Sequence, residues 1–159
     1  MKIGVLSDTH LHQVTEALIQ IYDQYLSDKD LILHAGDIVS LDVVNFLAKK
    51  KEFHGVCGNM DPLEVKHLLP EKEILDLAGY RLGLVHGWGQ PEGLEARIAT
   101  QFQEVDIIVY GHSHRAANHV ENGVLFFNPG TATGYSAKAG HSIGVLELTE
   151  TIRGDIVHI

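Results

Sequence analysis

Five short apolar segments, spread along the chain, are each followed by polar side chains of the kind that bind metal ions. The segments are Lys2–Leu6, Leu31–Ala35, Phe53–Cys57, Leu82–Val85 and Ile107–Tyr110. Their length and composition are typical of buried strands. The polar residues that follow them are Asp8, His10, Asp37, Asn59, His86, His112 and His114. Because ligands of α/β sheets gather outside the carboxyl ends of the strands, this recurrence predicts one polar, metal-binding edge.

The composition fits a single globular domain that spans residues 1–159. Hydrophobic residues make up 45% of the chain and charged residues 21%, which allows a proper core. The formal net charge is −9. This charge argues against a stable complex with nucleic acid or with an anionic membrane surface, because both need a basic face. A small phosphate-bearing substrate stays compatible with it, because bound metal ions would reverse the charge locally.

The single cysteine and the lack of long apolar runs favour a cytoplasmic location. Cys57 has no second cysteine in the chain with which to form a disulfide, and we expect it to be a small buried hydrophobe. Met1 leads directly into the first strand, without the segments of a signal peptide. No apolar run approaches the roughly 20 residues of a membrane span. We therefore expect a cytoplasmic protein without a membrane partner, either monomeric or a homo-oligomer.

Periodic apolar residues predict three helices between the strands. The three helices are Val14–Leu26, Ser40–Lys50 and Pro91–Phe102. Thr15 is a suitable N-cap for the first helix, and Ser40 caps the second. The first third of the chain is therefore β-α-β-α-β, which predicts a parallel sheet with right-handed crossovers.

The second half of the chain changes to hairpins and closing strands. The hairpin segments are Ile74–Leu77 with Tyr80–Val85, and Ala117–Val120 with Val124–Phe127. The closing strands are Ile143–Leu148 and Ile156–Ile159, after a flexible loop at Gly134–Gly140. The first hairpin is either an interface or a core element. An α/β beginning that ends in antiparallel pairs predicts two packed sheets with helices outside.

The seven polar side chains have the composition of a site for two metal ions. They offer carboxylate, amide and imidazole ligands but no thiolate, which suits Mn²⁺, Fe, Co²⁺, Ni²⁺ or Zn²⁺ better than a structural zinc site. Seven ligands are too many for one ion and suit two ions that share a bridging carboxylate. Any one of these histidines alone would more simply be a packed or surface residue. Their repetition at five strand ends favours the metal site.

The same residues resemble, in order, the motif set of the calcineurin-like metallophosphoesterases. The matching motifs are Asp8-Thr9-His10, Gly36-Asp37, Gly58-Asn59, His86-Gly87 and Gly111-His112-Ser113-His114. The segment Asn128-Pro129-Gly130-Thr131-Ala132 is further similar to the small single-domain branch, the YfcE-type phosphodiesterases. The resemblance covers essentially the whole chain. It implies an α/β fold in which a two-sheet β-sandwich is flanked by helices, in α-β-β-α layers.

The resemblance also implies a role for each residue. One ion would be held by Asp8, His10 and His114, and the second by Asn59, His86 and His112. Asp37 would bridge the two ions, which we expect to be manganese, with Fe, Co, Ni or Zn as alternatives. The residues of the reaction itself would be Asn59, Asp37 and His86. A hydroxide held between the ions would attack the phosphorus of a small phosphodiester in line.

The third motif departs from the pattern of much of the superfamily, in which a histidine follows the asparagine and can protonate the leaving group. Here that residue is Met60, which has no proton to donate. The change favours phosphodiesters with good leaving groups, unless another acid such as His12 takes this part. A phosphomonoesterase is the weaker enzyme alternative for the same reason.

Several residues near the motifs have two interpretations. Asp61 and His34 either orient ligating imidazoles or are a turn cap and a packed strand-end residue. Residues 128–131 either line the pocket or form a structural turn. Trp88 and Tyr135 either form an aromatic wall or pack in the ordinary way. The histidines expected on the surface or in the core are His54, His67, His119, His141 and His158.

Two functions outside small-molecule hydrolysis are compatible with such a fold. A retromer subunit of similar architecture uses its surface as a protein-interaction scaffold. A scaffold does not need intact ligands, whereas all seven positions here carry competent side chains. A nuclease is disfavoured by the acidic charge and by the lack of a basic, aromatic stripe. The sequence therefore predicts a metal-dependent phosphodiesterase that acts on small phosphodiesters.

Overall fold

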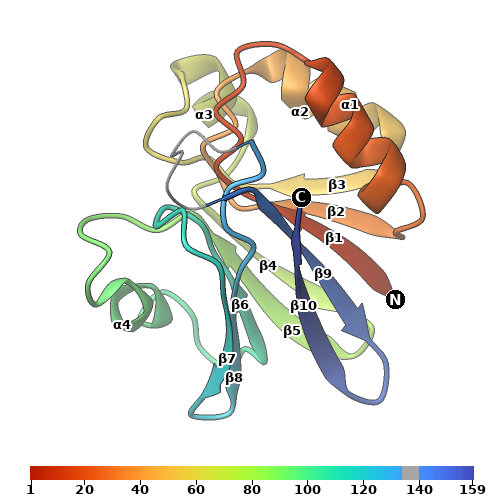
Figure 1. Ribbon diagram of the computed structural model, residues 1–159. Coiled ribbons are helices and arrows are strands. Elements are labelled where there is room, and N and C mark those ends of the chain that lie inside the picture. The colour runs from red at the N-terminus through yellow and green to blue at the C-terminus, as the bar shows by residue number, and fades with distance from the viewer. Residues whose placement is uncertain (134–139) are drawn as a thin grey trace.

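The strands form two five-stranded sheets in the computed structural model, which describes residues 1–133 and 140–159 (Figure 1). The first sheet contains β1 (Lys2–Leu6), β2 (Leu31–His34), β3 (Glu52–Gly55), β9 (Ser142–Leu148) and β10 (Ile152–His158), in the order β10-β9-β1-β2-β3. The second contains β4 (Lys72–Leu77), β5 (Tyr80–Val85), β6 (Ile107–Val109), β7 (Ala117–Glu121) and β8 (Val124–Asn128), in the order β4-β5-β6-β8-β7. Residues 134–139 of the predicted flexible loop, Tyr135 among them, lie outside the described residues.

The parallel unit β1-β2-β3 and its two crossover helices confirm the prediction for the first third of the chain. Helix α1 (Glu16–Ile21) continues into a π-helical turn at Tyr22–Leu26, and α2 (Leu41–Lys50) follows β2. The predicted caps hold, because the Thr15 hydroxyl accepts a hydrogen bond from the Leu18 N–H and the Ser40 hydroxyl accepts one from the Asp42 N–H. Both helices cover the same face of the first sheet (Figure 1).

Other boundaries differ from the prediction for local reasons. Helix α4 (Leu94–Ala99) is shorter than the predicted 91–102, because Gly93 before it has a left-handed φ of 69°. The one-and-a-half-turn helix α3 (Leu63–Leu68) was not predicted, since its exposed leucines give no apolar face. Strand β10 starts four residues earlier than predicted. The charged residues Arg153 and Asp155 interrupt the apolar run from which the strand was predicted. None of the helices in the described ranges is long and apolar enough to cross a membrane.

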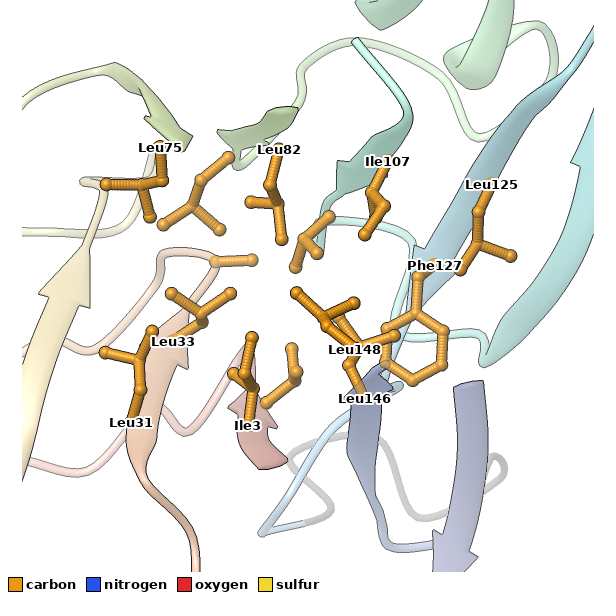
Figure 2. Close-up of a cluster of buried hydrophobic side chains, with 14 of the residues drawn as sticks. Ile3, Leu31, Leu33, Leu75, Leu82, Ile107, Leu125, Phe127, Leu146 and Leu148 are labelled. Atoms are coloured by element: carbon orange, nitrogen blue, oxygen red, sulfur yellow. The ribbon is translucent and has the colours of Figure 1, made fainter. Parts of the chain in front are cut away.

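The main core lies between the two sheets, and Figure 2 shows its side chains meeting from both sides. Ile3 and Leu33 come from the first sheet, and Leu82 and Phe127 from the second. Leu75 and Leu82 place the β4–β5 hairpin in this core, as one of the two interpretations expected. Two further clusters fill the space under α1 and α2 and under α4. These layers confirm the predicted two-sheet sandwich flanked by helices.

Candidate metal centre

The ends of five strands meet at one edge of the sandwich, and this edge carries all seven predicted ligand residues. Backbone hydrogen bonds connect neighbouring loops of the same sheet there, from Asp8 N to Gly36 O at 3.0 Å in the first sheet and from Gly111 N to His86 O at 3.1 Å in the second. The Asp8 carboxylate connects the two sheets, since its Oδ2 accepts a hydrogen bond of 3.1 Å from the His112 N–H. The fold therefore fixes these residues relative to one another.

Asp8, His10 and His114 form a first group, with one ligand atom of each within 4.8 Å of the others. His114 Nε2 lies 3.2 Å from Asp8 Oδ1. His10 Nε2 lies 3.3 Å from His114 Nε2 and 3.9 Å from Asp8 Oδ1. This group matches the three residues that the resemblance assigns to one ion.

Asp37 connects this group with the remaining residues. Its Oδ2 lies 3.8 Å from His10 Nε2 on one side and 3.3 Å from His86 Nε2 on the other. Asn59 Oδ1 lies 3.2 Å from His86 Nε2 and 3.0 Å from His112 Nδ1. Asp37 therefore occupies the position between two clusters of ligand atoms that a bridging carboxylate needs.

Two backbone carbonyls orient the imidazoles. His86 Nδ1 donates to Ala35 O at 2.7 Å, and His112 Nε2 donates to Gly89 O at 2.7 Å. These bonds leave Nε2 of His86 and Nδ1 of His112 facing the centre, as ligating imidazoles require. Neither carbonyl is recognisable in the sequence, because any residue type could supply it.

The charges and the buried atoms of the centre fit divalent metal ions. Asp8 and Asp37 are 0% and 2% exposed, and the nearest imidazole nitrogens lie 3.2 Å from Asp8 Oδ1 and 3.3 Å from Asp37 Oδ2. Burial opposes protonation of His86, but Asp37 and Asp8 outweigh it and raise the pKa of this imidazole. Asp8 likewise raises the pKa of His114 against the effect of burial. Two buried carboxylates surrounded by imidazoles call for compensating positive charge, which bound metal ions supply.

Five of the seven residues have a left-handed backbone. The φ angles are 51° for Asp8, 47° for His10, 54° for Asp37, 67° for His112 and 55° for His114. Such angles are uncommon for residues other than glycine, although Asp and His tolerate them better than most. Strained backbone of this kind concentrates at functional sites, where the surrounding structure enforces it. The surrounding structure therefore holds these five residues in strained backbone conformations, and their side chains point towards one centre.

Asp61 joins the loops that carry Asp37 and Asn59. Its buried carboxylate accepts hydrogen bonds from three backbone N–H groups, of Asp37 at 3.0 Å, Val39 at 2.6 Å and Gly58 at 2.7 Å. It therefore holds the backbone of the loops that carry Asp37 and Asn59, and its hydrogen bonds among the described residues go to backbone N–H groups rather than to an imidazole. The turn-capping interpretation is closer, because the residue caps two loops at once.

Asp61→Asn should lower both stability and metal affinity. The amide keeps one acceptor oxygen but turns an NH₂ group towards a backbone N–H, and hydrogen bonds to a charged acceptor contribute about 1.5–3 kcal/mol each. We expect a loss of roughly 3 kcal/mol of unfolding free energy and a 10–100-fold weaker metal affinity. Urea titration and metal-binding titration measure the two effects. Asp106→Asn is the control, since its exposed carboxylate accepts one hydrogen bond among the described residues, from the Arg81 N–H. Equal behaviour of the two variants would contradict the role of Asp61.

His34 and the segment at 128–131 have structural rather than ligating roles. His34 is fully buried at the end of β2 and contacts the Thr9 hydroxyl at 3.1 Å, and burial lowers the pKa of its imidazole to about 3. Asn128 Nδ2 donates to Gly111 O at 2.9 Å, and the Thr131 hydroxyl donates to Asp8 O at 2.9 Å. The structural-turn interpretation of this segment is therefore correct, and the turn supports two of the metal-binding loops.

A cleft of about 440 Å³ opens beside Asn59 and His86. Trp88, 44% exposed, lines it, as the aromatic-wall interpretation requires. Cys57, just beyond β3 rather than inside it, lies buried at the same cleft. His12 is exposed and makes no hydrogen bond or ion pair with any other described residue. The histidines expected outside the centre are exposed or partly exposed, namely His54, His67, His119, His141 and His158.

Comparisons with known proteins agree with this centre. A model of the calcineurin-like phosphoesterase superfamily domain matches residues 1–151. A probable metallophosphoesterase of Methanocaldococcus jannaschii is 34% identical over 137 residues, which are 84% of this chain and 69% of that protein. A phosphodiesterase of the same organism is 29% identical over 177 aligned positions, with 99% of both chains covered.

The fold is shared more widely than the sequence. The structure of vacuolar protein sorting 29 from Cryptosporidium parvum has a TM-score of 0.76 and 24% identity, and it covers 99% of this chain and 98% of its own. At this identity the similarity shows the fold alone. The motifs, the two-sheet sandwich and the matched domain model together show that the chain belongs to the calcineurin-like phosphoesterase superfamily.

Proposed function

We propose that this metal-dependent phosphoesterase hydrolyses small phosphodiesters at a centre of two metal ions, with manganese as the expected metal. The observation that carries the proposal is the position of Asp37 Oδ2, 3.8 Å from His10 Nε2 and 3.3 Å from His86 Nε2. A carboxylate with histidine ligands on both sides suits a pair of ions better than a single one. The phosphodiesterase of Methanocaldococcus jannaschii, similar along its whole length, supports the choice of a diester.

The chain's own residues position the ions and the substrate. When bound, such ions would activate a water as the nucleophile and would offset charge on the phosphoryl oxygens. Asp8, His10 and His114 would hold one ion, and Asn59, His86 and His112 the other. Asn59 directs Oδ1 towards His86 and His112. Its Nδ2 group is left to donate a hydrogen bond to a phosphate oxygen.

Met60 supports the preference for diesters with good leaving groups. Its backbone N–H donates to Asp37 Oδ1 at 2.8 Å, so the residue stands beside the bridging position. Its side chain is 53% exposed and has no proton to give. A leaving group that departs without protonation, such as an aryloxide, therefore suits this site best.

Met60→His should raise turnover of a phosphomonoester with a poor leaving group, such as glycerol 2-phosphate. A positioned general acid contributes about 10²–10⁴-fold, and we expect at least about tenfold from an acid that is introduced without further optimisation. Release of inorganic phosphate measures the effect, and Met60→Leu is the control. Equal rates for the two variants would mean that the missing acid does not limit the reaction.

The proposal is tested by hydrolysis of bis(p-nitrophenyl) phosphate beside p-nitrophenyl phosphate. Both are run on chelator-stripped protein, with and without added Mn²⁺. Turnover of the diester that Mn²⁺ restores, with little turnover of the monoester, is the expected result. A preference for the monoester would replace the proposal by a phosphomonoesterase.

A protein-interaction scaffold is the second candidate. The fold similarity to vacuolar protein sorting 29 favours it. No turnover of either ester by protein that has bound its metal ions would support this candidate. The convergence of all seven ligand residues ranks it below catalysis, since a scaffold has no use for the strained loops that produce this arrangement.

A further inference from the structure

Two lysines, Lys66 and Lys72, line the cleft beside the metal centre, and hydrolysis of a simple diester does not require their positive charge. Six of its lining residues are Asn59, Lys66, Glu71, Lys72, His86 and Trp88. Asn59 and His86 belong to the metal centre, so the cleft begins where the phosphoryl group would bind. Lys66 comes from α3, Glu71 and Lys72 from the residue before β4 and its first residue, and Trp88 from the loop after β5. A substituent of the phosphate therefore has a formed space to occupy.

The ammonium groups of both cleft lysines contact backbone carbonyls rather than carboxylates. Lys66 Nζ donates to Asn59 O at 3.4 Å, and Lys72 Nζ donates to Gln101 O at 3.2 Å. Neither forms an ion pair with a carboxylate of the described residues. Two lysines on one cleft give it a local positive charge in a chain that has 12 Lys and Arg against 21 Asp and Glu. With Glu71 as the carboxylate of the lining, the cleft keeps a net charge of one positive unit.

Trp88 gives the same cleft a flat apolar wall. This residue is 44% exposed, so its ring is accessible to a molecule that occupies the cleft. The loop that carries it is held in place, because the Arg97 guanidinium donates to the Trp88 carbonyl at 3.0 and 3.3 Å. A fixed aromatic face beside cations is suited to a planar ring with a negative charge.

We propose that one arm of the natural phosphodiester lies in this cleft and carries a planar ring and one additional anionic group. The ring would lie against Trp88, and the anion would bind between Lys66 and Lys72. The proposal rests on the proposed phosphodiesterase function and adds the substrate class. The protein is then expected to prefer diesters with an anionic aryl or heteroaryl arm over diesters whose arms are neutral or cationic.

Trp88 is the only tryptophan of the chain, so its fluorescence reports directly on the cleft. Metal-loaded full-length protein is titrated with 4-nitrobenzenesulfonate, which quenches tryptophan and is a poor metal ligand. The uncharged 4-nitrobenzenesulfonamide is the matched probe, and N-acetyltryptophanamide corrects for collisional quenching. We expect the sulfonate to bind at least about tenfold more tightly, a difference of roughly 1.4 kcal/mol.

The double variant Lys66→Gln/Lys72→Gln should remove this preference, while Lys49→Gln on the exposed end of α2 should leave it unchanged. Equal binding of the two probes to the wild type, or a preference that survives in the double variant, would overturn the proposal. Because binding is measured without turnover, an inactive protein would count against the phosphodiesterase function and leave this test of the cleft intact.

Discussion

Asp37→Asn is expected to abolish phosphodiester hydrolysis and to reduce the bound metal. The amide is nearly isosteric with the carboxylate but neutral, so it cannot bridge two cations or compensate their charge. Removing one preorganised electrostatic contact costs about 10²–10³-fold in rate, and we expect the upper end or more, roughly 10³-fold, because Asp37 serves both ions. Turnover of bis(p-nitrophenyl) phosphate and metal analysis of the same preparation measure the two effects.

Asp76→Asn is the matched control for this change. Asp76 is an exposed carboxylate on β4, and its replacement removes the same charge outside the centre. Its activity and metal content should equal those of the wild type. Full activity of Asp37→Asn with its metal content intact would remove the bridging role and with it the two-ion centre.

Gly58→Ala should inactivate the centre although it replaces none of the seven predicted ligand residues. A Cβ at this position would overlap Asp37 Oδ1 and lie 2.6 Å from the Asp37 backbone nitrogen and 2.8 Å from a ring carbon of His86. Two of the predicted ligands would have to move, and a misplacement of about 1 Å can reduce a rate by roughly 10²-fold. We expect that loss in turnover, together with about 1–3 kcal/mol of lost unfolding free energy from overpacking.

Gly83→Ala separates this effect from general crowding. A Cβ on Gly83 would lie 2.7 Å from the Phe102 ring, in the cluster under α4. This variant should lose stability in the same way but keep its metal and its turnover. Wild-type turnover in Gly58→Ala, or equal losses in both variants, would show that the loop at Gly58 does not position the centre.

The sequence predicts that the seven candidate ligand residues lie together because each follows a strand, and strand ends are fixed by the fold. Asp8, Asp37 and His86 are examples, since each comes within three residues of the end of a buried strand whose apolar run is plain in the sequence. The two-sheet architecture follows from the same runs. Short elements were harder to predict, as α3 and the start of β10 show, because exposed or charged residues hide their pattern.

The supporting contacts of the centre are not predictable from a single sequence. The backbone carbonyls of Ala35 and Gly89 orient two imidazoles. Every residue type has such a carbonyl, so the sequence does not show which ones take this role. Asp61 before Pro62 has the sequence pattern of a turn. Only the fold shows that its carboxylate accepts hydrogen bonds from three backbone N–H groups of two loops. The left-handed backbone of the ligands is likewise a product of tertiary structure.

The most direct test of the two-ion centre is a titration of chelator-stripped protein with Mn²⁺ that follows bound metal and hydrolysis of bis(p-nitrophenyl) phosphate together. We predict that two ions bind per chain and that the rate rises with the second ion, because Asp37 joins two sets of ligand atoms. Full activity with a single ion bound, or no hydrolysis with two ions bound, would contradict the proposed mechanism.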